Sequence, residues 1–60
     1  MHIFQFYTSK VNEVWNAIYL TGGVEVINEY AGCFTIECID LIAKDKFFIE
    51  YYRMTNENIN

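Results

Sequence analysis

Proline is absent from this 60-residue chain, and glycine occurs only three times. The composition therefore lacks the bias of a flexible linker or a low-complexity segment. No run of eighteen apolar residues occurs, so no transmembrane helix is expected. The first residues show neither the basic stretch nor the long apolar run of a signal peptide. We therefore expect a cytoplasmic protein whose cysteines stay reduced.

Positive charge is also scarce. Eight acidic residues outnumber four basic ones, and the net charge is −4. Phosphate backbones are bound mainly through Lys and Arg side chains, so this balance argues against direct nucleic-acid binding. An acidic surface instead favours solubility or a basic protein partner.

Residue types that catalyse reactions or hold metals are few. His2 is the single histidine and lies beside the chain start, where nothing fixes the imidazole as a general base. Cys33 and Cys38 are five positions apart. This odd offset places them on opposite faces of one strand and makes a disulfide between them implausible. Two cysteines and a distant histidine do not complete a zinc site. We predict no catalytic residue, cofactor or metal, and we expect both cysteines to be small core residues.

Apolar residues, by contrast, are abundant, at 53% of the chain with 18% aromatic. A domain of this length buries only roughly 60% of the surface that its unfolded chain exposes. Small domains therefore often need a disulfide, a metal or a second subunit. The composition predicts one folded domain, 1–60, that uses its excess apolar surface to associate.

The first half of the chain predicts a strand at 2–7, a helix, and a strand at 24–30. Thr8 or Ser9 is expected to cap the helix, and Gly22-Gly23 to end it. The helix is predicted from one apolar stripe at i, i+3, i+4, i+7 and i+8, made of Val11, Val14, Trp15, Ile18 and Tyr19.

The second half predicts two more strands. Ala31-Gly32 is expected to form a tight turn into a strand at about 33–42, and Lys44-Asp45 a turn into a strand at 46–54. Residues 55–60 are mostly polar and are expected to fray. The predicted fold class is α+β, with a single helix packed on a small, mostly antiparallel sheet in the order β-α-β-β-β. If the first strand lies parallel within the sheet, its crossover should be right-handed.

Two-residue turns at Ala31-Gly32 and Lys44-Asp45 would fix the register of the strands that they join. The expected pairs are Tyr30 with Cys33, Asn28 with Thr35 and Val26 with Glu37 across the first turn, and Ile42 with Phe47, Asp40 with Ile49 and Cys38 with Tyr51 across the second. Side chains alternate along strands, so this register assigns each residue to a face. The face predicted to lie under the helix carries Ile27, Phe34, Ile36, Cys38, Ile42, Phe47, Ile49 and Tyr51. The opposite face carries Val24, Val26, Tyr30, Ile39, Leu41, Phe48, Tyr52 and Met54. One helix covers one face, so the second should remain as an apolar patch, and large patches of this kind mark interfaces. A two-fold homodimer is the commonest closed form.

Glu37 and Glu50 fall on this second face as diagonal neighbours. Two nearby like charges are unfavourable unless they are solvated or meet a cation, so they are either solvated glutamates or a site for a partner's Arg or Lys. Interface residues, for a second copy or another partner, are therefore predicted to be Val26, Tyr30, Glu37, Ile39, Phe48, Glu50, Tyr52 and Met54.

In size, acidity and lack of a catalytic motif, the chain resembles the small stand-alone inhibitors that phages encode against bacterial enzymes, including anti-defence proteins. The resemblance implies a homodimer in the bacterial host cytoplasm that binds and inhibits a host enzyme through a few aromatic anchors. One alternative is a structural or assembly subunit of a larger bacterial or phage complex. Another is an acidic nucleic-acid mimic using Glu25, Glu29, Glu37, Asp40 and Glu50.

Overall fold

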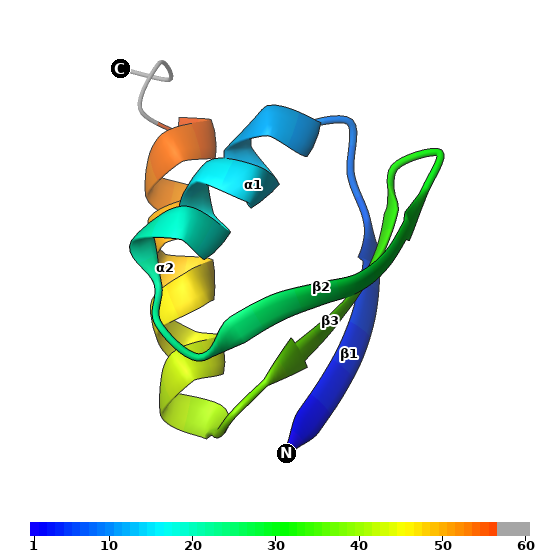
Figure 1. Cartoon of the computed structure of the whole chain (residues 1–60). Coiled ribbons are helices and arrows are strands. Elements are labelled where there is room, and N and C mark those ends of the chain that lie inside the picture. Colours follow the sequence, from blue (N-terminus) through cyan, green and yellow to red (C-terminus); the bar gives the residue numbers. More distant parts are fainter. Residues whose placement is uncertain (57–60) are drawn as a thin grey trace.

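The computed structural model describes residues 1–56 and has the element order β-α-β-β-α (Figure 1). The elements are β1 (His2–Tyr7), α1 (Val11–Leu20), β2 (Val24–Tyr30), β3 (Cys33–Cys38) and α2 (Leu41–Asn56). The α+β class is confirmed, whereas the predicted final strand is a helix. The frayed tail was expected from residue 55, but 55 and 56 belong to α2, and the rest of that prediction lies outside the described residues.

The sheet has the strand order β1-β3-β2, and β3 is antiparallel to both neighbours. β1 and β2 therefore run parallel to each other on either side of β3, without pairing, and α1 connects them. Both helices lie on the same side of this sheet (Figure 1). Along β3, Phe34, Ile36 and Cys38 are fully buried, so these side chains form the sheet's contribution to the core.

The predicted turn of the hairpin between β2 and β3 is confirmed, but the predicted register is wrong for part of the two strands. Ala31 and Gly32 have φ values of 52° and 84°, the left-handed pair that a two-residue hairpin requires. The predicted pairs Tyr30–Cys33 and Asn28–Thr35 form. A bulge between Val26 and Asn28 then shifts the register by one residue, so Val26 pairs with Ile36 instead of Glu37.

The predicted strands at 33–42 and 46–54 and the turn at Lys44-Asp45 are wrong. β3 ends at Cys38, and the chain enters α2 through Asp40, whose carboxylate accepts a 2.8 Å hydrogen bond from the Ala43 amide. That contact is a helix N-cap, which satisfies an amide that has no partner within the helix. The residues that α2 buries are spaced four apart, namely Ala43, Phe47 and Tyr51. An apolar run rich in aromatics fits the two-residue period of a strand as well as the 3.6-residue period of a helix. Here the cap and the four-residue spacing of the buried residues favour the helix.

The helix α1 follows its predicted stripe only in part. Val14 and Ala17 are fully buried, but Trp15 is 46% and Tyr19 is 89% exposed. The predicted cap is also wrong, because the Thr8 hydroxyl accepts from the Lys10 amide in the turn before the helix, and no side chain caps α1. The helix ends as expected just before the Gly22-Gly23 pair.

Aromatic rings fill the space between sheet and helices. The Phe6 ring centroid lies 6.0 Å from that of Phe34 and 5.7 Å from that of Tyr51. Burying one such side chain contributes about 1.5–3 kcal/mol. The Tyr51 hydroxyl lies 2.7 Å from the Thr8 hydroxyl in a shared hydrogen bond, so its polar tip is satisfied at the core boundary.

Candidate interaction surface

The sheet face turned away from both helices, called the open face below, is the candidate site. Cys33, Thr35 and Glu37 of β3 alternate with the buried core residues and are only half-buried. Cross-strand pairing extends them into three rows, which are Ile3–Glu37–Glu25, Gln5–Thr35–Asn28 and Tyr7–Cys33–Tyr30. No element of residues 1–56 covers this face (Figure 1).

The row at the hairpin end is aromatic. Tyr7 and Tyr30 are 77% and 78% exposed on either side of Cys33. A hydrogen bond to the Cys33 side chain raises the pKa of Tyr7 above its usual 10.0. Exposed tyrosines combine an apolar ring with a polar tip, and they are enriched in protein interfaces.

The middle row is polar. The Gln5 side-chain amide donates a 3.2 Å hydrogen bond to the Thr35 hydroxyl. Asn28, the third member of the row, is exposed. The open face is therefore less apolar than predicted, because half of the residues assigned to it belong to α2.

The row at the other end of the sheet is acidic. Glu25 and Glu37 are direct register partners on neighbouring strands, an arrangement in which like charges repel. Among residues 1–56, neither carboxylate has an ion-pair partner. The salt bridge in this part of the chain joins Glu50 and Arg53 of α2. A cation from another molecule would relieve this repulsion.

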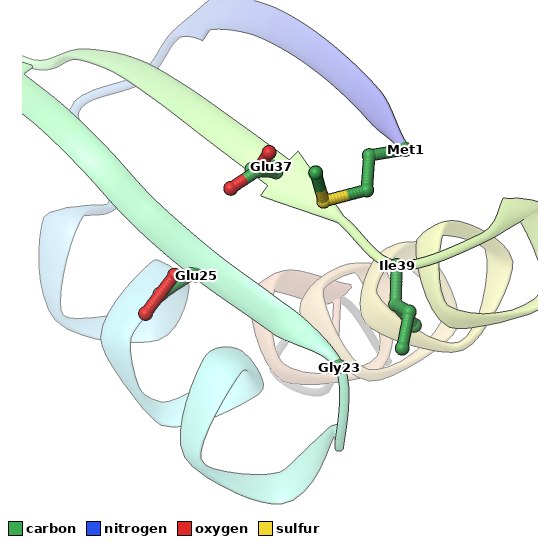
Figure 2. Close-up of a pocket in the computed structure, with 5 residues that line it drawn as sticks. All are labelled: Met1, Gly23, Glu25, Glu37 and Ile39. Atoms are coloured by element: carbon green, nitrogen blue, oxygen red, sulfur yellow. The ribbon is translucent and has the colours of Figure 1, made fainter.

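A shallow pocket of about 200 Å³ lies beside this acidic row and is lined by Met1, Gly23, Glu25, Glu37 and Ile39 (Figure 2). Gly23 has a φ of 81°, and a Cβ at this position would lie 2.5 Å from the Ile39 Cγ2 atom. The close approach of Ile39 therefore requires glycine here. The pocket combines apolar walls with two carboxylates, which suits the long apolar stem and charged tip of a Lys or Arg side chain.

The two cysteines are free and lie on opposite faces, as their spacing predicted. Cys38 is fully buried, and burial raises the pKa of its thiol. Cys33 is half-buried on the open face, so the prediction that both are core residues holds only for Cys38. His2 is exposed on β1, and residues 1–56 contain no group of three His, Cys, Asp or Glu side chains that could hold a metal ion.

The predicted interface residues do not form one surface. Glu37 and Tyr30 lie on the open face, and Ile39 is at its pocket. Val26 is half-buried against the core, which corrects its assignment to the uncovered face, because the bulge changes its register. The remaining four, Phe48, Glu50, Tyr52 and Met54, lie on α2, so the predicted diagonal pair of Glu37 and Glu50 does not exist.

Sequence reasoning missed Ile3, Tyr7 and Glu25 as members of the same surface. Ile3 is 61% exposed and pairs with Glu37, while Glu25 pairs with Glu37 from the other side. The alternation of the first strand could have identified Ile3 and Tyr7 as one side of it. The pairing of Glu25 with Glu37 depends on the bulge, and no residue pattern in the sequence predicts that bulge.

Several carboxylates proposed for nucleic-acid mimicry are engaged within the fold. Glu29 accepts a hydrogen bond from the Gly32 amide in the hairpin turn, Asp40 caps α2, and Glu50 pairs with Arg53. Only Glu25 and Glu37 remain directed to the open face. Two carboxylates make a poor imitation of a phosphate backbone, which carries one charge per 3.4 Å of each strand.

Comparisons of the chain with protein-family models, with curated proteins and with solved structures find no match. Within residues 1–56, no helix has the length and apolar character needed to cross a membrane.

Proposed function

We propose that this chain is a non-enzymatic protein-binding module that acts by covering a functional surface of another protein. In its most specific form, it is a homodimeric phage or mobile-element inhibitor of a host defence enzyme. Such an inhibitor requires no chemistry of its own, because a rigid patch with a few aromatic anchors suffices to exclude a substrate.

The observation that carries the proposal is the composition of the open face. It presents two exposed tyrosines, Tyr7 and Tyr30, and the facing carboxylates Glu25 and Glu37. Like charges on directly paired residues of neighbouring strands are unfavourable, and Glu25 and Glu37 are such a pair. A partner that inserts Arg or Lys beside them would gain charge-assisted hydrogen bonds while the tyrosines supply contact area. The expected target is therefore a protein with a basic surface.

The test is affinity capture of the tagged chain from bacterial lysates, with mass spectrometry of the bound proteins. Three baits are compared, namely the native chain, a variant with Glu25→Gln and Glu37→Gln, and a variant with Asp45→Asn and Glu13→Gln. The last variant removes the same charge from the two helices. We expect one stoichiometric enzyme with the native chain and the helix variant, and its loss with the open-face variant.

Activity of the captured enzyme is then assayed with the purified chain. Inhibition supports the inhibitor, and capture of structural components of a complex supports an assembly subunit instead. Equal capture by all three baits would show that the open face is not the binding surface. Capture of nothing by the native chain, from hosts of several kinds, would contradict the proposal.

A further inference from the structure

The two edges of the sheet are built differently. The β2 edge carries Glu25 and Glu29 and is interrupted by the bulge between Val26 and Asn28. Charges and bulges are the usual means by which a sheet edge avoids pairing with another chain. The β1 edge has no Asp, Glu, Lys or Arg, no proline and no bulge over His2–Tyr7. Within its own residues β1 thus lacks the features that normally block strand addition, and the cation that it meets on its helix side is Lys44 of α2, whose Nζ lies 4.9 Å from the Phe4 ring centroid.

The hydrogen-bonding direction of β1 follows from one contact. The Thr8 amide donates a 2.9 Å hydrogen bond to the Gly32 carbonyl, so at Thr8 the backbone faces the β3 side. Because bonding direction alternates along an antiparallel strand, Phe6, Phe4 and His2 bond to β3 as well. The backbone groups of Ile3, Gln5 and Tyr7 therefore point outward, and no strand of residues 1–56 pairs with them.

These three outward residues are spaced symmetrically about Gln5. A second β1 strand, antiparallel and related by a two-fold axis at Gln5, pairs Ile3 with the copy's Tyr7 and Gln5 with its equivalent. All three positions then exchange both backbone hydrogen bonds, and the axis stands normal to the sheet, so the open faces of both copies lie on the same side. We propose that β1 pairs with the β1 of a second copy in this register, forming a continuous six-stranded sheet.

The side chains along the edge fit this occupant. On the helix side, Phe4 and Phe6 are only half-buried, and the Phe48 ring lies 5.1 Å and 5.7 Å from their centroids. Tyr52 stacks on Phe48 and is 54% exposed. The proposed register brings Phe4 of one copy beside Phe6 of the other, so a second copy extends the aromatic cluster that a monomer leaves partly exposed.

On the open face, the same register places Ile3 beside the copy's Tyr7, a β-branched and aromatic pair that favours sheet formation. The two Gln5 amides face each other at the axis with no charge to repel. The assembly leaves Glu25, Glu37 and Tyr30 uncovered on both copies. This inference rests on the proposed function, in which the chain is a homodimer. It deepens that function by naming β1 as the strand that joins the two copies.

The test is sedimentation equilibrium at micromolar concentration. The native chain should show twice the 7.1 kDa chain mass. Gln5→Lys places two ammonium groups together at the axis and should return the chain to a monomer, or weaken association at least tenfold. Asn28→Lys is the matched control, because it adds the same charge to the same row of the open face at the opposite edge, and it should remain a dimer.

A second variant keeps the proposal testable if Gln5→Lys fails to fold, as judged by circular dichroism. Paired Cα atoms at hydrogen-bonded positions lie about 5.5 Å apart, within the range that a disulfide spans. In a Cys33→Ser background, Gln5→Cys should therefore oxidise to a covalent dimer, whereas Thr35→Cys, one strand further in, should not.

A monomeric native chain overturns the proposal, and so does a dimer that Gln5→Lys leaves intact. If the native chain is monomeric but Gln5→Lys loses the captured host protein, the edge instead pairs with a strand of the target. The capture test with Glu25→Gln and Glu37→Gln tests binding by the open face alone, whereas sedimentation equilibrium tests pairing at β1. The two experiments therefore distinguish a failure of the proposed dimer from a failure of the proposed function.

Discussion

The two faces of the sheet share the same three strands but have opposite physical characters. On the covered face, Phe34, Ile36 and Cys38 are fully buried and touch the helices and their aromatic rings. On the open face, the alternating neighbours Cys33, Thr35 and Glu37 are half-buried and touch mainly their cross-strand partners. The covered face is constrained by packing, whereas the open face keeps even a repulsive carboxylate pair. The covered face therefore determines stability, and the open face is free to carry binding residues.

The cysteines provide the largest expected contrast between the faces. Cys38 is fully buried and burial raises its thiol pKa, so an alkylating reagent reaches it only when the fold opens. We expect Cys33 to react at least about a hundredfold faster than Cys38, as a domain stability of several kcal/mol implies. Mass spectrometry of timed iodoacetamide reactions gives both rates. Equal rates would mean that the helices do not seal the covered face.

The next contrast is between neighbouring positions on β3. Phe34→Ala leaves a cavity between the sheet, Trp15 and Phe6, and should lower the free energy of unfolding by about 3–5 kcal/mol. Thr35→Ala, one residue along on the open face, loses the Gln5 hydrogen bond and should cost less than about 1 kcal/mol. Urea denaturation followed by circular dichroism measures both. Similar losses would show that the open face is packed as well.

The helix that completes the covered face depends on its cap. Asp40→Ala removes the hydrogen bond to the Ala43 amide and should cost about 1 kcal/mol, while Asp40→Asn or Asp40→Ser should restore most of it. Thermal and urea denaturation of the three variants give the comparison. If alanine and serine behave alike, the carboxylate contact does not hold the start of α2.

The smallest effect is expected at the acidic row. Glu37→Gln should raise the free energy of unfolding by a few tenths of a kcal/mol, because it ends the repulsion with Glu25. Glu25→Gln should give the same gain, and the double variant should gain less than the sum, since one substitution already removes the repulsion. The gain should shrink in high salt. A loss of stability instead would show that favourable contacts of the carboxylates with other groups outweigh their mutual repulsion.

Local patterns predicted the first two thirds of the chain well. Strand alternation, the helical stripe, the Gly22-Gly23 stop and the Ala31-Gly32 turn each act within a few residues, so the observed β1, α1, β2 and the start of β3 follow them. The segment from Leu41 to Asn56 failed because Phe47, Ile49 and Tyr51 alternate like a strand while Ala43, Phe47 and Tyr51 repeat like a helix. Asp40 as an N-cap is a second local feature, beside the four-residue repeat, that favours the helix.

The candidate surface was predicted less well than the fold. Glu37 and Tyr30 were placed on an uncovered face, and they lie on one. The predicted neighbours of Glu37 were wrong, because the bulge places Glu25 opposite it. Phe48 and Tyr52, which were assigned to this face, lie on α2 instead. Once the last strand became a helix, the expected apolar face became a mixed one with tyrosines, amides and carboxylates.

The amino-acid sequence by itself determined the charge of this protein, the separation of its two cysteines onto opposite faces and the hairpin turn, because each depends on composition or on backbone geometry over a few residues. Tertiary structure alone decided that β3 is the central strand, that β1 is an edge and that both helices cover the same face. Those features follow from which apolar surfaces bury one another over long separations in the chain. Where an apolar segment fits a strand and a helix equally well, as Leu41–Asn56 does, its local periodicity cannot determine which one forms.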